Sequence, residues 1–108
     1  MMRTSGIYLA AAMLEIGGCF AVWSVLRRDA ALGWLALAAA ALAGFAWLLA
    51  QSEQAFAGRA FAAYGGVYVA ASLAWLAAVE RTAPTASDLI GGALVLAGAT
   101  VIVWGARA

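Results

Sequence analysis

The sequence predicts an all-α membrane protein with four transmembrane helices joined by short loops. Hydrophobic residues make up 68% of the 108 residues and charged residues only 10%, far from the composition of a soluble domain. The charged residues also cluster, and the apolar stretches cover roughly residues 6–26, 30–51, 60–79 and 88–106. Each stretch is close to the ~20 residues with which a helix crosses a bilayer.

The four segments are apolar on every face, whereas membrane strands alternate apolar and polar residues, so helices are expected. They fill residues 1–108 as a single domain and leave no soluble part for a separate activity, so we expect no enzyme and no nucleic-acid partner. The chain has one cysteine and no histidine, which excludes an internal disulfide and leaves no imidazole for a metal. We expect no cofactor and no metal.

Segment 6–26 carries one acid, Glu15, near its midpoint. The segment resembles a lipoprotein signal ahead of Cys19, but an acid in the core and apolar residues after Cys19 favour a retained helix. An ionised residue at the centre of a span costs about 2.5–3.5 kcal/mol, so such residues usually mark functional sites. Small residues and one phenol share its helix face, which leaves space beside the carboxyl: Tyr8, Ala11, Gly18, Cys19 and Val22.

Two interpretations of Glu15 remain open. Burial in hydrocarbon favours the protonated form of a carboxyl, whereas a nearby cation favours the ionised form. A proton and a cation therefore compete at one carboxylate, which is the physical basis of exchange. Alternatively, Glu15 is a protonated structural tie that hydrogen-bonds two helices.

Segment 30–51 is uncharged, and it lies between the short connections 27–29 and 52–59. A third short connection, residues 80–87, contains the single proline. Short connections make sequential helices antiparallel neighbours.

Segment 60–79 has an aromatic face that includes Tyr64 and Tyr68, and such faces can hold an organic cation. The adjacent Gly65 and Gly66 weaken the helix there and predict a bend. Tryptophans, by contrast, all lie near span ends, as an interfacial aromatic belt places them: Trp23, Trp34, Trp47, Trp75 and Trp104.

Segment 88–106 contains Gly91, Gly98 and Gly105 at seven-residue spacing, so they lie within about 20° of one line and allow another backbone to approach closely. Such a stripe can serve packing inside one subunit or between subunits. We expect a dimer interface, because four thin helices are few to bound a polar pathway.

The arginines give no orientation preference by the positive-inside rule. Three fall on the side of the termini and three on the other side: Arg3, Arg59 and Arg107 against Arg27, Arg28 and Arg81. A tie predicts insertion in both orientations, which permits an antiparallel homodimer in the lipid bilayer. A chance tie among six arginines is the alternative.

Three stretches carry a family resemblance: GRAFAAYGGVYVAASLAWL at 58–76, LEIGGCF at 14–20, and Asp88 followed by GGALVLAG up to residue 98. Over nearly the whole chain they resemble the YnfA-like family of small bacterial inner-membrane proteins. That family is similar to the small multidrug resistance transporters, four-helix proteins that work as antiparallel dimers and exchange protons for cationic compounds.

By this resemblance Glu15 matches the central carboxylate of helix one, Gly18 the glycine after it, and Tyr64 the aromatic residue of helix three. WLLAQ at 47–51 matches the end of helix two, and Gly91 with Gly98 the dimer-forming glycines of helix four. Tyr64 stands where the exporters typically have Trp, and Tyr68 where a small residue is usual. These departures imply a narrower or more polar pocket.

Three functions are compatible with the sequence. The first is proton-coupled export of small organic cations through Glu15, with Tyr8, Gly18, Tyr64 and Tyr68 at the binding site. The second is a passive ion channel of the same dual-topology plan. The third is a non-transporting membrane protein that stabilises or regulates a partner.

Overall fold

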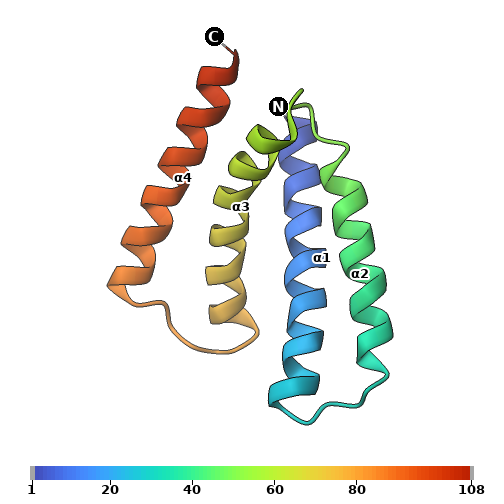
Figure 1. Ribbon diagram of the computed structural model, residues 1–108. Helices are drawn as coiled ribbons and strands as arrows, with labels where there is room; N and C mark the ends of the chain where they lie inside the picture. The colour runs from blue at the N-terminus through green and yellow to red at the C-terminus, as the bar shows by residue number, and fades with distance from the viewer. Residues whose placement is uncertain (1, 108) are drawn as a thin grey trace. The chain divides into compact units, whose positions relative to one another are not determined.

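The computed structural model describes residues 2–107, with side chains described for residues 3–105. It contains four helices in chain order: α1 (Met2–Arg27), α2 (Trp34–Leu49), α3 (Ala57–Ala78) and α4 (Ala86–Arg107) (Figure 1). The described residues form no strand, so the predicted all-α class is confirmed. The Arg107 side chain, one of the three arginines on the side of the termini, lies outside the described residues.

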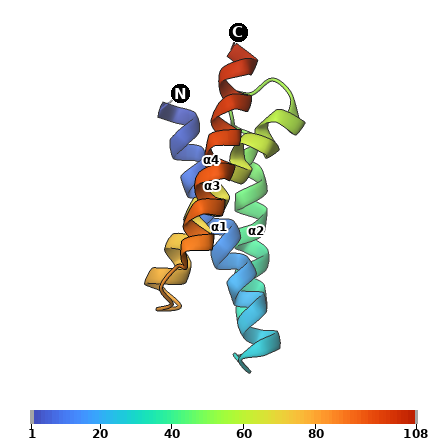
Figure 2. The same cartoon turned by 90° about the vertical axis from the view of Figure 1, so that its left-hand side faces the viewer.

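The helices form two units, Met1–Ser52 and Glu53–Ala108. The first unit is a helical hairpin of α1 and α2, and the second is a helical hairpin of α3 and α4. Within the first hairpin the two helices pack against each other and lie side by side in Figure 1, and in the turned view α1 crosses in front of α2 (Figure 2). The predicted antiparallel pairing of sequential helices therefore holds inside each hairpin.

The length of α1, α3 and α4 suits a membrane. All three are long and apolar enough to cross one, whereas α2 is a shorter apolar helix of 16 residues. At 1.5 Å per residue α2 spans about 24 Å, less than the ~30 Å hydrocarbon core. Tight turns extend it at both ends, because Trp34 N–H bonds to Ala31 O at 3.1 Å and Ser52 N–H to Leu49 O at 3.2 Å.

The first hairpin is closely packed around Gly18 of α1. A Cβ at Gly18 would lie 3.0 Å from Leu42 Cγ and 3.2 Å from the Ala38 carbonyl oxygen, both on α2. Gly44 of α2 makes the reciprocal approach, since a Cβ there would lie 3.3 Å from Leu14 Cδ1. Small residues thus bring α1 and α2 together, as is usual where lipid supplies no hydrophobic driving force.

The second hairpin uses glycine in the same way. A Cβ at Gly66 of α3 would lie 2.5 Å from Ala99 Cβ on α4, and a Cβ at Gly92 of α4 would lie 2.9 Å from Leu73 Cδ1. Helix α3 continues without interruption through Gly65 and Gly66. The predicted bend at these glycines stays a prediction.

Both hairpin turns begin with a charged residue in the left-handed region, Asp29 at φ 56° and Arg81 at φ 55°. In each turn the next N–H bonds to a carbonyl six residues earlier, Ala30 to Ser24 at 3.1 Å and Thr82 to Leu76 at 3.0 Å. The Thr82 bond supplies a donor to a carbonyl near the end of α3, whereas the Ser24 carbonyl near the end of α1 also accepts from the Arg28 N–H at 2.9 Å.

Helix α4 begins with a reciprocal capping box. The Thr85 N–H donates to Asp88 Oδ2 at 2.9 Å, and the Asp88 N–H donates to Thr85 Oγ1 at 3.1 Å. Two of the backbone N–H groups at the helix start are satisfied in this way. The helix therefore begins at Ala86, two residues before the start that the charge pattern indicated.

Candidate functional site

The candidate site is centred on Glu15, which α1 carries in its middle portion. Its side chain is partly buried, and α1 extends beyond it in both directions through apolar residues. Around the helix Glu15 lies about 60° from Gly18 and about 100° from Leu14, the two residues that mark the contact with α2. The carboxyl therefore lies at the flank of the α1–α2 contact.

Tyr8 lies almost on the same line of α1 as Glu15, two turns earlier. Its side chain is only 4% exposed, and its hydroxyl oxygen is buried. A phenol and a carboxyl thus share one face of α1, as the seven-residue spacing predicts. The axial rise between two residues at this spacing is about 10 Å, which places them at different depths along the helix.

The small residues on this face do not all leave space. Gly18 is buried against Leu42 and Ala38 of α2, and Ala11 is fully buried. Cys19 is exposed and Val22 is partly buried. Close helix packing therefore accounts for glycine at position 18 by itself, and a role for Gly18 in binding stays a prediction.

Tyr64 and Tyr68 of α3 form an aromatic pair. Their ring centroids lie 6.0 Å apart at an interplanar angle of 56°, a tilted arrangement within the favourable range for aromatic rings. Tyr64 is 6% exposed, whereas Tyr68 is partly exposed. Gly66, which contacts α4, lies about 160° around α3 from both tyrosines, so the pair lies on the side of α3 away from α4.

The glycine series of α4 lies on an open face. Gly91, Gly98 and Gly105 are exposed, and a Cβ at any of them would meet nothing within 4 Å. Leu94 and Val101 on the same side are 69% and 70% exposed. Within this hairpin, Gly66 and Gly92 make the close approaches between helices, so the seven-residue series is left available for another surface.

The structure places Tyr8 and Glu15 on one face of α1 at different depths, places Gly18 at the contact with α2, and brings Tyr64 and Tyr68 of α3 into contact. The two groups belong to different hairpins. Among the described residues no group of three or more His, Cys, Asp or Glu side chains is placed to hold a metal ion.

Sequence reasoning missed three arrangements. The capping box was present as Thr-Ala-Ser-Asp at 85–88, a pattern with a recognised spacing. Arg27 stacks on Trp23, four residues earlier, and that spacing is also readable. The packing roles of Gly44 and Gly92 had no sequence signal, because they depend on how each helix is rotated toward its neighbour.

The whole chain, residues 1–108, matches the family described as "Uncharacterised BCR, YnfA/UPF0060 family". The chain belongs to this family. A relative named "UPF0060 membrane protein" from Ectopseudomonas mendocina (strain ymp) is 52% identical over 100 residues, which cover 93% of this chain and 91% of the relative. No solved structure matches the chain significantly.

Membership of the YnfA/UPF0060 family confirms the resemblance found in the sequence stretches around Glu15, Tyr64 and Asp88. Together with the helices described above, it identifies a membrane protein with several apolar helices, consistent with a multi-pass arrangement.

Proposed function

We propose that this chain is a small transporter of the bacterial inner membrane that exchanges protons for small organic cations. The observation that carries the proposal is the partly buried carboxyl of Glu15 in the middle of α1, a helix long and apolar enough to cross a membrane. A carboxyl at that depth is costly when ionised, and it persists in membrane helices mainly where it serves a function.

The chemistry of exchange follows from the two forms of the Glu15 carboxyl. A proton and a bound cation compete for the same carboxylate oxygens, because a cation beside a carboxyl favours its ionised form. Loading a cation therefore promotes release of the proton, and protonation promotes release of the cation. This competition couples the two movements without any further titratable group in the middle of α1.

The pair of Tyr64 and Tyr68 supplies a second element of the proposed site. A tilted pair of rings presents an aromatic surface, and aromatic faces attract quaternary ammonium and guanidinium groups. Because Tyr64 is buried and Tyr68 is partly exposed, Tyr68 is the residue that we expect to contact a cation first.

The proposed working form is an antiparallel homodimer. The open glycine face of α4, Gly91 with Gly98 and Gly105, fits close approach of a second helix backbone. The even distribution of arginines fits insertion in both orientations. A dimer would contribute two copies of Glu15.

The experiment that tests the proposal measures proton release and charge movement on purified protein. Solid-supported-membrane electrophysiology, screened across quaternary ammoniums, guanidinium ions and polyamines, is expected to give substrate-dependent currents that weaken as the pH falls. Glu15→Gln keeps the shape but cannot ionise, so it should abolish both the currents and the proton release on mixing. Glu15→Asp should retain exchange with a shifted pH optimum.

The alternatives predict different results in the same assays. A passive channel would give cation uptake that does not depend on a pH gradient. A stabilising or regulatory membrane protein would give no currents, and its cellular phenotype would survive Glu15→Gln. Normal transport by the Glu15→Gln variant would overturn the proposed role of the carboxyl.

A further inference from the structure

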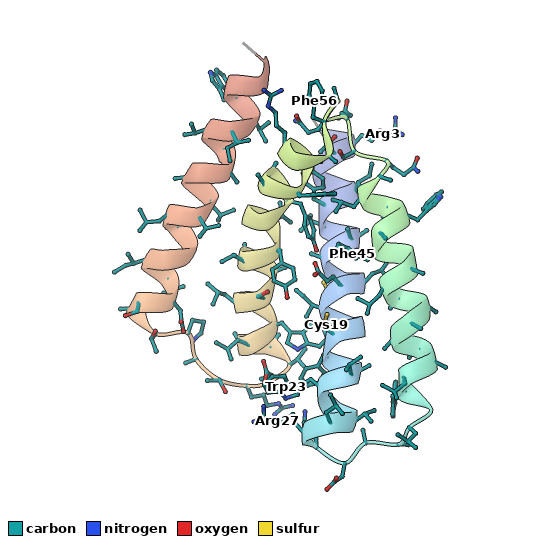
Figure 3. The ribbon with its side chains drawn as sticks, viewed as in Figure 1. Arg3, Cys19, Trp23, Arg27, Phe45 and Phe56 are labelled. Atoms are coloured by element: carbon teal, nitrogen blue, oxygen red, sulfur yellow. The ribbon has the colours of Figure 1, made fainter. Side chains whose placement is uncertain are left out.

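The end of α1 carries two adjacent arginines, each placed over an aromatic ring. The Arg27 guanidinium carbon lies 4.6 Å from the centroid of Trp23, and that of Arg28 lies 5.5 Å from the centroid of Phe20. Figure 3 shows Trp23 and Arg27 at the same end of α1. Arg28 follows the last residue of α1 and reaches back two turns, so both guanidinium groups lie along the end of one helix.

The two charges are available to a ligand. Both side chains are exposed, and within the described residues neither guanidinium group is paired with a carboxylate. Asp29 follows them, so the three residues together carry a net charge of +1. Ring contacts restrict the guanidinium groups without neutralising them, which leaves their N–H donors for an anion.

The surroundings of the pair are apolar. Leu26 and Leu32, on either side of the turn, are 75% and 74% exposed, and Trp23 is also exposed. A soluble anion would gain nothing from these side chains. A phospholipid would, because its acyl chains contact the apolar residues while its phosphate lies at the level of the interfacial tryptophan and the arginines.

We propose that Arg27 and Arg28 bind the phosphate of an anionic phospholipid at the end of α1. Arginine suits this ligand because its planar fork matches phosphate oxygens in pairs. Trp23 and Phe20 hold the two guanidinium groups in place, and Leu26 and Leu32 contact the lipid chains. The site is separate from Glu15, and it does not depend on transport.

The test is native mass spectrometry of the full chain, released from detergent micelles that contain equal amounts of phosphatidylglycerol and phosphatidylcholine. We expect the wild-type chain to retain phosphatidylglycerol preferentially. Each basic residue that acts on the bound anionic lipid changes its association about fivefold. The double variant Arg27→Gln/Arg28→Gln should therefore lose the preference by about an order of magnitude or more.

Matched controls distinguish binding at Arg27 and Arg28 from non-specific attraction of anionic lipid to the positive charge of the chain. Arg59 also lies over an aromatic ring, Phe56, at 5.5 Å, but it has no adjacent arginine. Arg59→Gln should leave the preference within about twofold, and Arg27→Lys/Arg28→Lys should keep part of it, because the charges remain but the paired donors of the guanidinium fork are lost. Added inorganic phosphate at lipid concentration should not displace the lipid.

Three results would overturn the proposal. These are equal retention of both lipids by the wild-type chain, an unchanged preference in the double glutamine variant, or displacement by inorganic phosphate as effective as that by lipid. Glu15→Gln is expected to keep the lipid preference in full, so failure of the transport proposal and failure of the lipid site are distinguishable.

Discussion

Replacing Gly66 by alanine tests the close approach of α3 and α4. The added Cβ would lie 2.5 Å from Ala99 Cβ, about 1–1.5 Å inside the usual separation of about 3.5–4.0 Å between carbon atoms. Both atoms are Cβ atoms, whose positions are fixed by the backbone. No side-chain rotation therefore relieves the overlap, and the two helices must move apart. Overpacking of this kind typically costs about 1–3 kcal/mol.

Gly65→Ala is the matched control, because a Cβ at Gly65 would meet nothing within 4 Å. Both substitutions gain the same helix propensity, about 1 kcal/mol relative to glycine, so the propensity term cancels in the difference between them. We expect the unfolding free energy of the Gly66→Ala variant to be about 1–3 kcal/mol lower than that of the Gly65→Ala variant.

The assay is reversible unfolding in mixed micelles of a mild detergent and sodium dodecyl sulfate, followed by far-UV circular dichroism and tryptophan fluorescence. Equal unfolding free energies for the two variants, within about 0.5 kcal/mol, would refute the described packing of α3 on α4. A smaller loss of unfolding free energy is expected for Gly18→Ala in the first hairpin, because the nearest α2 atoms lie 3.0 and 3.2 Å from the new Cβ.

Three further predictions concern the start of α4, the assembly and the topology. Thr85→Ala removes the hydroxyl that accepts from the Asp88 N–H and should lower the unfolding free energy by about 0.5–2 kcal/mol, whereas Ser87→Ala should change it little. Gly98→Leu should lower the dimer fraction measured by crosslinking, whereas Gly17→Leu, equally open within the chain, should not; equal dimer content would remove α4 from the interface. One added Lys at each terminus should fix both termini in the cytoplasm, as scored by labelling from each side, and one-sided labelling of the unmodified chain would contradict dual topology.

The number of helices and the fold class could be predicted from the sequence because both depend on the length of the apolar stretches and on the charged residues that separate them. Asp29 and Arg81 interrupt the apolar runs at the places where α1 and α3 end. The ends of the helices were less predictable. Arg3 lies inside α1, which begins before the apolar segment does. A helix can continue beyond the hydrocarbon region, because its backbone satisfies its own hydrogen bonds there as well.

The candidate site was predictable only in part. Glu15 and the neighbouring phenol of Tyr8 follow from helical spacing, which is a local property of α1. The burial of Gly18 against Leu42 does not follow, because it depends on the rotation of α1 and α2 about their axes. Arg28 over Phe20 was also hidden, since it requires the side chain to fold back after the helix has ended.

The division into two hairpins changes the meaning of the even arginine count. In the first hairpin Arg27 and Arg28 at the turn outnumber Arg3, so the positive-inside rule favours its turn in the cytoplasm. In the second hairpin a single Arg81 at the turn is outnumbered by Arg59 and Arg107, so the rule favours its turn outside.

Sequential insertion of the four helices with short loops allows only one of these preferences to be met, because the ends of both hairpins then lie on the same side of the membrane. The tie therefore arises from two hairpins with opposed orientation preferences. Removing one arginine from either hairpin is expected to decide the orientation of both, so a single charge in one half of the chain controls how the other half enters the membrane.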